Sequence, residues 1–153
     1  RTRLYVSNQA SDTVSVFDIS TLTPVTMHAP VAVGNSPNSL AVLPDGSAVY
    51  VASTGTNSVT LINGNSFLTQ QIAASDAAGA TVTSVGTSVA GSKVYATVVE
   101  PTNTKNGTAI IRVTDNVLVT TIGAPQQDLT CKPSSTVTCP LMRPAQVATR
   151  QQQ

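Results

Sequence analysis

A motif built around a tyrosine occurs three times in this chain at a constant spacing. The segment LYVSN at 4–8 returns as VYVAS at 49–53 and as VYATV at 94–98. The tyrosines that define the motif stand 45 residues apart, at Tyr5, Tyr50 and Tyr95. A fixed period of this length indicates a repeat architecture, in which one supersecondary unit is copied along the chain.

Each repeat contains four short apolar or alternating runs separated by turn residues, which predicts an antiparallel four-stranded meander. In the second repeat we expect strands over 39–43, 48–53, 58–63 and 67–72. Turn glycines keep the same register in two copies, at Gly46 and Gly91. The Asn63-Gly64 pair favours a primed hairpin turn with positive φ.

Composition supports a β protein. Ser and Thr make up 39 of the 153 residues and Val another 21, whereas only 10% are charged. β-Branched residues favour strands, and the usual helix formers are scarce. Four-stranded units of 40 to 45 residues in series are typical of β-propeller blades. We therefore predict an all-β chain of about three blade-equivalents, an incomplete propeller.

The residues also resemble a known family. The run at 5–8 (YVSN), followed by DTVSVFD at 12–18, is similar to the YVTN β-propeller repeat of bacterial and archaeal surface-layer and periplasmic proteins. The linking stretch at 33–46 resembles the segment that joins blades in that family. The likeness covers residues 3 to about 122 and weakens in the third copy, where Ala96-Thr97-Val98 replaces the polar end of the motif.

The phase of the repeat gives the expected boundaries. We expect a blade without its first strand at 3–27, full blades at 38–72 and 81–122, a connection at 123–142 and the first strand of a further blade at 143–149. The segment at 107–113 of the third copy corresponds to 57–63 of the second, and it is expected to lie five residues late, after an insertion near 100–104. The first residue is Arg1 and not Met, which suggests a processed or trimmed protein.

Three blades are too few to close a ring, which typically needs four to eight. One hypothesis is that the remaining blades belong to a longer chain. The other is that a second copy supplies them, for example as a six-bladed ring of two chains. In either case the expected partners are other propeller blades.

Cys131 and Cys139 lie in the connection after the third blade. We interpret them as a disulfide that closes a short loop and adds about 2–3 kcal/mol on the chain-entropy model. A redox or metal-binding pair is the alternative, but such sites prefer two residues between the thiols and nearby histidines.

Few side chains suggest chemistry. The single histidine follows a methionine, Met27-His28, and this pair is either a transition-metal site or an exposed loop. Asp12, Asp18 and Asp45 recur at repeat positions, which favours Asx turns and strand ends over metal binding. We predict no catalytic residue, no bound metal and no cofactor.

One non-repeating loop is the best candidate for a specific interaction surface. Its candidate contact residues are Glu100, Pro101, Asn103 and Lys105. Loops that depart from a repeat are where binding specificity is often placed.

Charge and hydropathy narrow the class of partner. The 8 basic and 7 acidic residues are scattered singly, and aromatic residues make up only 3%, which argues against nucleic acid. No apolar run approaches the 18 residues of a membrane-spanning helix. Low charge and paired cysteines favour an extracellular, cell-surface or periplasmic location.

Two functions fit these observations. The first is an exported, non-catalytic propeller module for protein–protein interaction, cell-surface attachment or scaffolding. The alternative is part of a propeller enzyme, either a lactonase-like hydrolase or a cofactor-dependent redox enzyme, with its catalytic residues in other blades.

Overall fold

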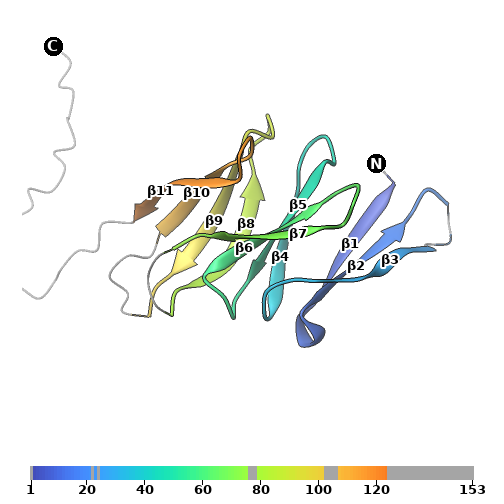
Figure 1. Ribbon diagram of the computed structural model, residues 1–153, viewed down its shortest axis with the longest axis horizontal. Coiled ribbons are helices and arrows are strands. Elements are labelled where there is room, and N and C mark those ends of the chain that lie inside the picture. Colours follow the sequence, from blue (N-terminus) through green and yellow to red (C-terminus); the bar gives the residue numbers. More distant parts are fainter. Residues whose placement is uncertain (1, 22, 24, 76–78, 102–106, 124–153) are drawn as a thin grey trace, which may run out of the picture.

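The computed structural model describes residues 2–21, 23, 25–75, 79–101 and 107–123, which form three antiparallel sheets arranged in a row in chain order (Figure 1). The first sheet has three strands, and the second and third have four each. The predicted all-β fold of four-stranded blades is confirmed, and the sheets do not close into a ring.

The first sheet comprises β1 (Arg3–Asn8), β2 (Thr13–Asp18) and β3 (Val25–Ala32), with a short 3-10 turn η1 (Gln9–Ser11) between β1 and β2. The second comprises β4 (Pro37–Val42), β5 (Ala48–Ser53), β6 (Ser58–Asn63) and β7 (Thr69–Ala73), and the third β8 (Thr81–Thr87), β9 (Lys93–Val99), β10 (Gly107–Arg112) and β11 (Val117–Gly123).

The repeat is visible in the strand register. Tyr5 lies opposite Val16, and Tyr50 lies opposite Leu61, which is 45 residues further along in both members of the pair. In the third sheet Ile111 lies opposite Val94, as Ile62 lies opposite Val49. The third copy is therefore four residues late, and the expected shift of five is wrong by one residue.

Side chains on β5 alternate between the two neighbouring sheets, because successive residues of a strand point to opposite faces. Val49 and Val51 pack with Val14 and Val16 of the first sheet. Tyr50 and Ala52 instead join the cluster that includes β8 and β9 residues such as Val82 and Val94. β5 is consequently buried along its whole length. Burying one valine side chain stabilises a fold by about 1.5 kcal/mol or more.

The first strands of the two four-stranded sheets, β4 and β8, are also joined by hydrogen bonds between residues at or next to equivalent positions of adjacent repeats. The side-chain amide of Asn38 donates to the carbonyl of Thr83 at 2.8 Å. The amide of Val85 donates to the hydroxyl of Ser39 at 3.1 Å. These polar contacts fix the second and third sheets in register with each other.

The turn glycines meet different steric demands. Gly46 and Gly91 have φ of 78° and 68°, as their shared turn position predicts. Gly64 does not adopt a positive φ, so the primed turn predicted at Asn63-Gly64 is wrong. A Cβ on Gly64 would lie 2.3 Å from the carbonyl oxygen of Gly46, so glycine is required there for close approach of two loops.

Phe67 also departs from expectation. It was expected to begin the fourth strand of the second sheet, but that strand begins at Thr69 and Phe67 has φ of 57° in the turn before it. Positive φ is uncommon for a bulky residue and marks a locally strained backbone. Surrounding contacts must hold Phe67 in this conformation.

No helix in the described ranges has the length and apolar character needed to cross a membrane. The predicted segments at 123–142 and 143–149, with Cys131 and Cys139, lie outside the described residues apart from Gly123 at the end of β11.

Candidate functional site

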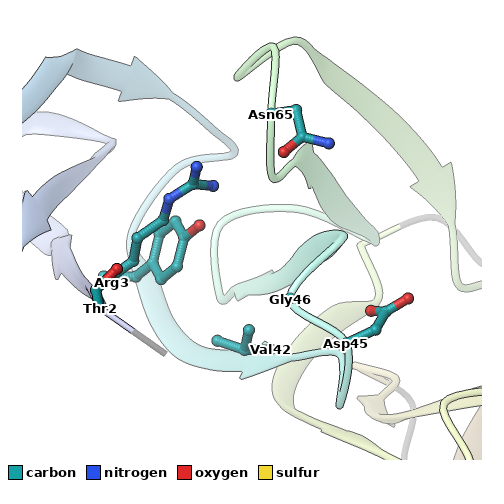
Figure 2. A pocket seen from close by; sticks show the side chains of 7 residues that line it. Thr2, Arg3, Val42, Asp45, Gly46 and Asn65 are labelled. Carbon is teal, nitrogen blue, oxygen red and sulfur yellow. The ribbon is translucent and has the colours of Figure 1, made fainter.

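A cleft of about 300 Å³ lies at the junction of the first and second sheets. Arg3 and Tyr5 of β1 form one wall, and loops of the second sheet form the other. Figure 2 shows Arg3 extending toward the loop that carries Asn65, with Val42 and Gly46 below it. The complete lining is Thr2, Arg3, Tyr5, Val42, Asp45, Gly46 and Asn65.

The two junctions between sheets differ at one polar contact. At the second junction the hydroxyl of Tyr50 donates to Asn116 Oδ1 at 2.7 Å. At the first junction Tyr5 takes the place of Tyr50, and Phe67 takes the place of Asn116. Phe67 and Asn116 occupy the same turn position, with φ of 57° and 56°. Because phenylalanine cannot accept the hydrogen bond, the Tyr5 hydroxyl is buried without a partner in the described structure.

Arg3 lines the same cleft as Tyr5. Its Nη1 donates to the carbonyl oxygen of Gly64. Its guanidinium carbon lies 5.7 Å from the centroid of the Phe67 ring, which is within cation–π range. Arg3 forms no ion pair with a carboxylate in the described ranges. The equivalent repeat positions are Ala48 and Lys93, so this guanidinium belongs to the first junction alone.

Phe67 is held between two side chains of the first sheet. Besides Arg3, His28 of β3 stacks on it, with ring centroids 4.7 Å apart and planes tilted by 35°. These two contacts tie the turn that carries Phe67 to the first sheet. The sequence gives one signal for this role: Phe67 stands where the third repeat has Asn116. Because phenylalanine is apolar, we assigned it to a strand and missed this signal.

Met27 and His28 lie in the outermost strand β3 and are exposed. The ring nitrogen Nδ1 of His28 lies 2.6 Å from the carbonyl oxygen of Ala29. No group of three or more His, Cys, Asp or Glu residues that could hold a metal ion occurs within the described ranges. His28 is thus placed to stack on Phe67.

The recurring aspartates have two structural roles. Asp18 and Asp45 accept hydrogen bonds from the amides of Ser20 and Ser47, the expected Asx turns. The hydrogen bond from Ser20 also holds the pKa of Asp18 below its usual value, with a smaller contribution from the charge of Arg3. Asp12 lies at the expected strand end, directly before β2, but it makes a longer-range contact: its Oδ1 accepts a hydrogen bond from the amide of Ser36 and ties this turn to the linker before β4.

The structure describes only part of the loop that was expected to form an interaction surface, namely Glu100 and Pro101. Glu100 is 9% exposed, and its Oε1 accepts a hydrogen bond from the hydroxyl of Ser75 at 3.3 Å. The expectation that Glu100 contacts a partner is corrected, because its carboxylate is turned into the protein. Pro101 is exposed, whereas Asn103 and Lys105 lie outside the described residues.

A second, shallower hollow of about 790 Å³ lies at the opposite ends of the strands. Its described lining contains no charged side chain. Small and amide-bearing residues form it: Val33, Gly34, Asn35, Thr54, Gly55, Thr56, Asn57, Ser58, Gln71, Gly79, Ala80 and Thr81. It offers hydrogen-bonding groups and no charge.

The outer faces of the row expose apolar residues whose equivalents are buried inside it. On β1, Leu4 and Val6 are 43% and 39% exposed, whereas the equivalent Val49 and Val51 of β5 are fully buried. At the other end Tyr95 is 39% exposed, although Tyr50 is fully buried. Each outer face therefore has the composition of a junction between blades.

Meanders of four strands, stacked face to face with a 45-residue repeat, define the described part of the chain as β-propeller blades. No model of a known protein family matches the sequence, and no curated protein matches it. Several solved structures share the fold, and the chain spans about a third of the length of each. Hydrazine synthase of Kuenenia stuttgartiensis has 23% identity and a TM-score of 0.67, over 80% of this chain and 33% of that one.

Two further structures show the same likeness. A protein of unknown function from Desulfotomaculum acetoxidans has 17% identity and a TM-score of 0.63, over 82% of this chain and 38% of that one. A candidate 6-phosphogluconolactonase from Bacteroides uniformis has 18% identity and a TM-score of 0.60, over 80% and 37%. At these identities the likeness concerns the fold alone.

Proposed function

We propose that this chain is part of an exported β-propeller of the YVTN-repeat kind that works by binding and not by catalysis. Its blades stack with further blades, and the assembled propeller presents its loops to a protein or cell-surface partner. The observation that carries the proposal is the exposure of Leu4 and Val6 on a face where the equivalent Val49 and Val51 are fully buried. Apolar faces of this kind mark interaction sites.

The first sheet adds a second argument. Within the described ranges it has three strands where the others have four, so β1 is an edge strand. An open strand edge next to an exposed apolar face is a template for pairing with another strand. A neighbouring blade would cover the edge and the face together.

The covered face can be tested in the natural protein with a matched pair of variants. Leu4→Asp places a charge on the proposed interface, and we expect it to lower the thermal midpoint by several degrees. Val89 is 97% exposed in the β8–β9 turn, so Val89→Asp is the matched control and leaves the midpoint unchanged. If Leu4→Asp is as silent as the control, no blade covers this face.

The origin of the neighbouring blades is a separate question. We propose that they belong to a longer chain, which predicts an intact mass well above 15.7 kDa for the natural polypeptide. A natural polypeptide near that mass that forms dimers in light scattering would instead support self-association.

Export and the disulfide are tested together. A cell fractionation experiment should place the protein outside the cytoplasm, and thiol titration of denatured, unreduced protein should find Cys131 and Cys139 oxidised. Two reactive thiols would contradict the disulfide. Stoichiometric calcium or copper in the purified protein would contradict a purely binding role.

A further inference from the structure

The cleft at the first junction contains hydrogen-bond donors that the protein itself does not use. The Tyr5 hydroxyl is buried and has no partner, although most buried polar groups in proteins are paired. Arg3 donates to the carbonyl of Gly64, which leaves most of its N–H donors without an acceptor in the described structure. The cleft thus combines one buried donor that has no partner, the Tyr5 hydroxyl, with a partly exposed guanidinium that has N–H donors to spare.

The second junction between sheets can be compared with the first, because the same repeat positions form both. At the second junction Asn116 accepts the hydrogen bond of Tyr50, so the structure completes the contact by itself. At the first junction Phe67 removes the acceptor, and Arg3 stands where the other repeats have Ala48 and Lys93. One junction therefore has a cleft lined by Arg3 where the other has a hydrogen bond within the protein.

We propose that this cleft binds a small carboxylate. A guanidinium presents paired N–H donors that match the two oxygens of a carboxylate, and a tyrosine hydroxyl supplies a further donor. Contact with the Phe67 ring and the bond to Gly64 hold the Arg3 guanidinium in place before a ligand arrives. The ligand pays less ordering entropy when its partner is already fixed.

Size and charge restrict the ligand further. A volume of about 300 Å³ is at the lower end for ligand pockets, so the ligand is a small organic acid. Asp45 also lines the cleft, with its carboxyl group directed away from Arg3 (Figure 2). The guanidinium of Arg3 can balance the single negative charge of a carboxylate. A phosphate dianion carries a second negative charge and is repelled more strongly by the Asp45 carboxylate. The site is separate from the proposed blade interface, because it lies between two sheets already stacked.

The test is an NMR titration of the natural protein with sodium acetate at constant ionic strength, with sodium chloride as the reference salt. We expect saturable shifts of the Arg3 side-chain Nε–H and of the Asn65 amide signals in acetate, and weaker binding of inorganic phosphate. Equal shifts in chloride, or tighter binding of phosphate than of acetate, would overturn the proposal.

Two variants and their repeat equivalents locate the site. Arg3→Gln and Tyr5→Phe should each weaken acetate binding about tenfold, the loss of one strong contact. Lys93→Gln and Tyr95→Phe change the corresponding residues of the third repeat and should leave binding unchanged. Acetate affinity that is unchanged in Tyr5→Phe and Arg3→Gln would contradict the assignment, and so would an equal loss in the two controls. If Arg3→Gln does not fold, the result for Tyr5→Phe alone decides whether the assignment holds.

Discussion

The hydroxyl of Tyr50 donates a hydrogen bond of 2.7 Å to Asn116 Oδ1 and thereby joins β5 of the second sheet to the β10–β11 turn of the third. Tyr5 has the same place in the first sheet, and Phe67 stands at the turn position equivalent to Asn116; both pack against the same buried cluster. The tyrosine at one repeat position is therefore hydrogen-bonded at one junction and has no partner at the other within the described residues. The repeat-defining tyrosine is a residue of the blade junction as well as a marker of the blade.

Removing the two hydroxyls should have different effects on stability. Tyr50→Phe breaks a partly buried hydrogen bond and leaves Asn116 without its donor, so we expect a loss of about 1 kcal/mol in the free energy of unfolding. Tyr5→Phe removes a hydroxyl that has no partner and should leave stability unchanged or slightly higher. Urea unfolding measures both. Equal losses in the two variants would show that the Tyr5 hydroxyl is paired in solution.

Stability should also depend on Tyr50 at alkaline pH. Burial raises the pKa of Tyr50 above its usual value of 10.0, because the phenolate is poorly solvated in the interior. The folded state therefore retains the proton longer than the unfolded state. This contribution is fully present below the unfolded pKa and is lost as pH rises through the folded pKa.

The measurement is the thermal midpoint between neutral pH and about pH 11, above the reference pKa of tyrosine. The Tyr50→Phe variant is the control, and its midpoint should fall less steeply over the alkaline range. Parallel curves for the two proteins would contradict the assigned cause.

Acid pH should act on the exposed pair of Arg112 and Asp115. Hydrogen bonds from Arg112 hold the pKa of Asp115 below its usual value, and the closest pair of atoms is 2.6 Å apart. The stabilisation is present above the unfolded pKa of the carboxyl and is lost as pH falls through the folded pKa. Asp115→Asn should flatten the acid side of the stability curve slightly, and added salt should reduce the difference. An Asp115 titration at its unperturbed pKa in NMR would refute this.

The close approach of loops at Gly64 predicts a strong steric effect. Gly64→Ala places a Cβ against the Gly46 carbonyl, so we expect a loss of about 2–3 kcal/mol in the free energy of unfolding. Gly86 in β8 has no atom within 4 Å of an added Cβ, so Gly86→Ala is the matched control and should cost little. Similar losses in both variants would mean that the contact with the Gly46 carbonyl does not set the effect.

Much of the fold follows from periodicity. The strands at 48–53 and 58–63 were predicted with their observed bounds, because alternating apolar residues of the central strands must face both neighbouring sheets. Gly46 and Gly91 were predicted for the same reason, since their turn requires positive φ. These features depend on local residues and on the repeat.

The features that were missed depend on contacts between repeats. Phe67 was assigned to a strand because it is apolar, and its role appears only when the four-residue shift of the third copy aligns it with Asn116. Glu100 was expected on the surface, but its side chain is buried and accepts a hydrogen bond from Ser75. Arg3 could have been singled out by comparison with Ala48 and Lys93, but its position over Phe67 required the packed junction.

A crystal structure of the natural protein would test the central claim, that both outer faces of this row of blades are covered by further blades. We predict a fourth strand paired with β1, apolar side chains packed on Leu4 and Val6, and a blade against Tyr95 at the other end. A structure in which Leu4, Val6 and Tyr95 all remain open to solvent would contradict the account.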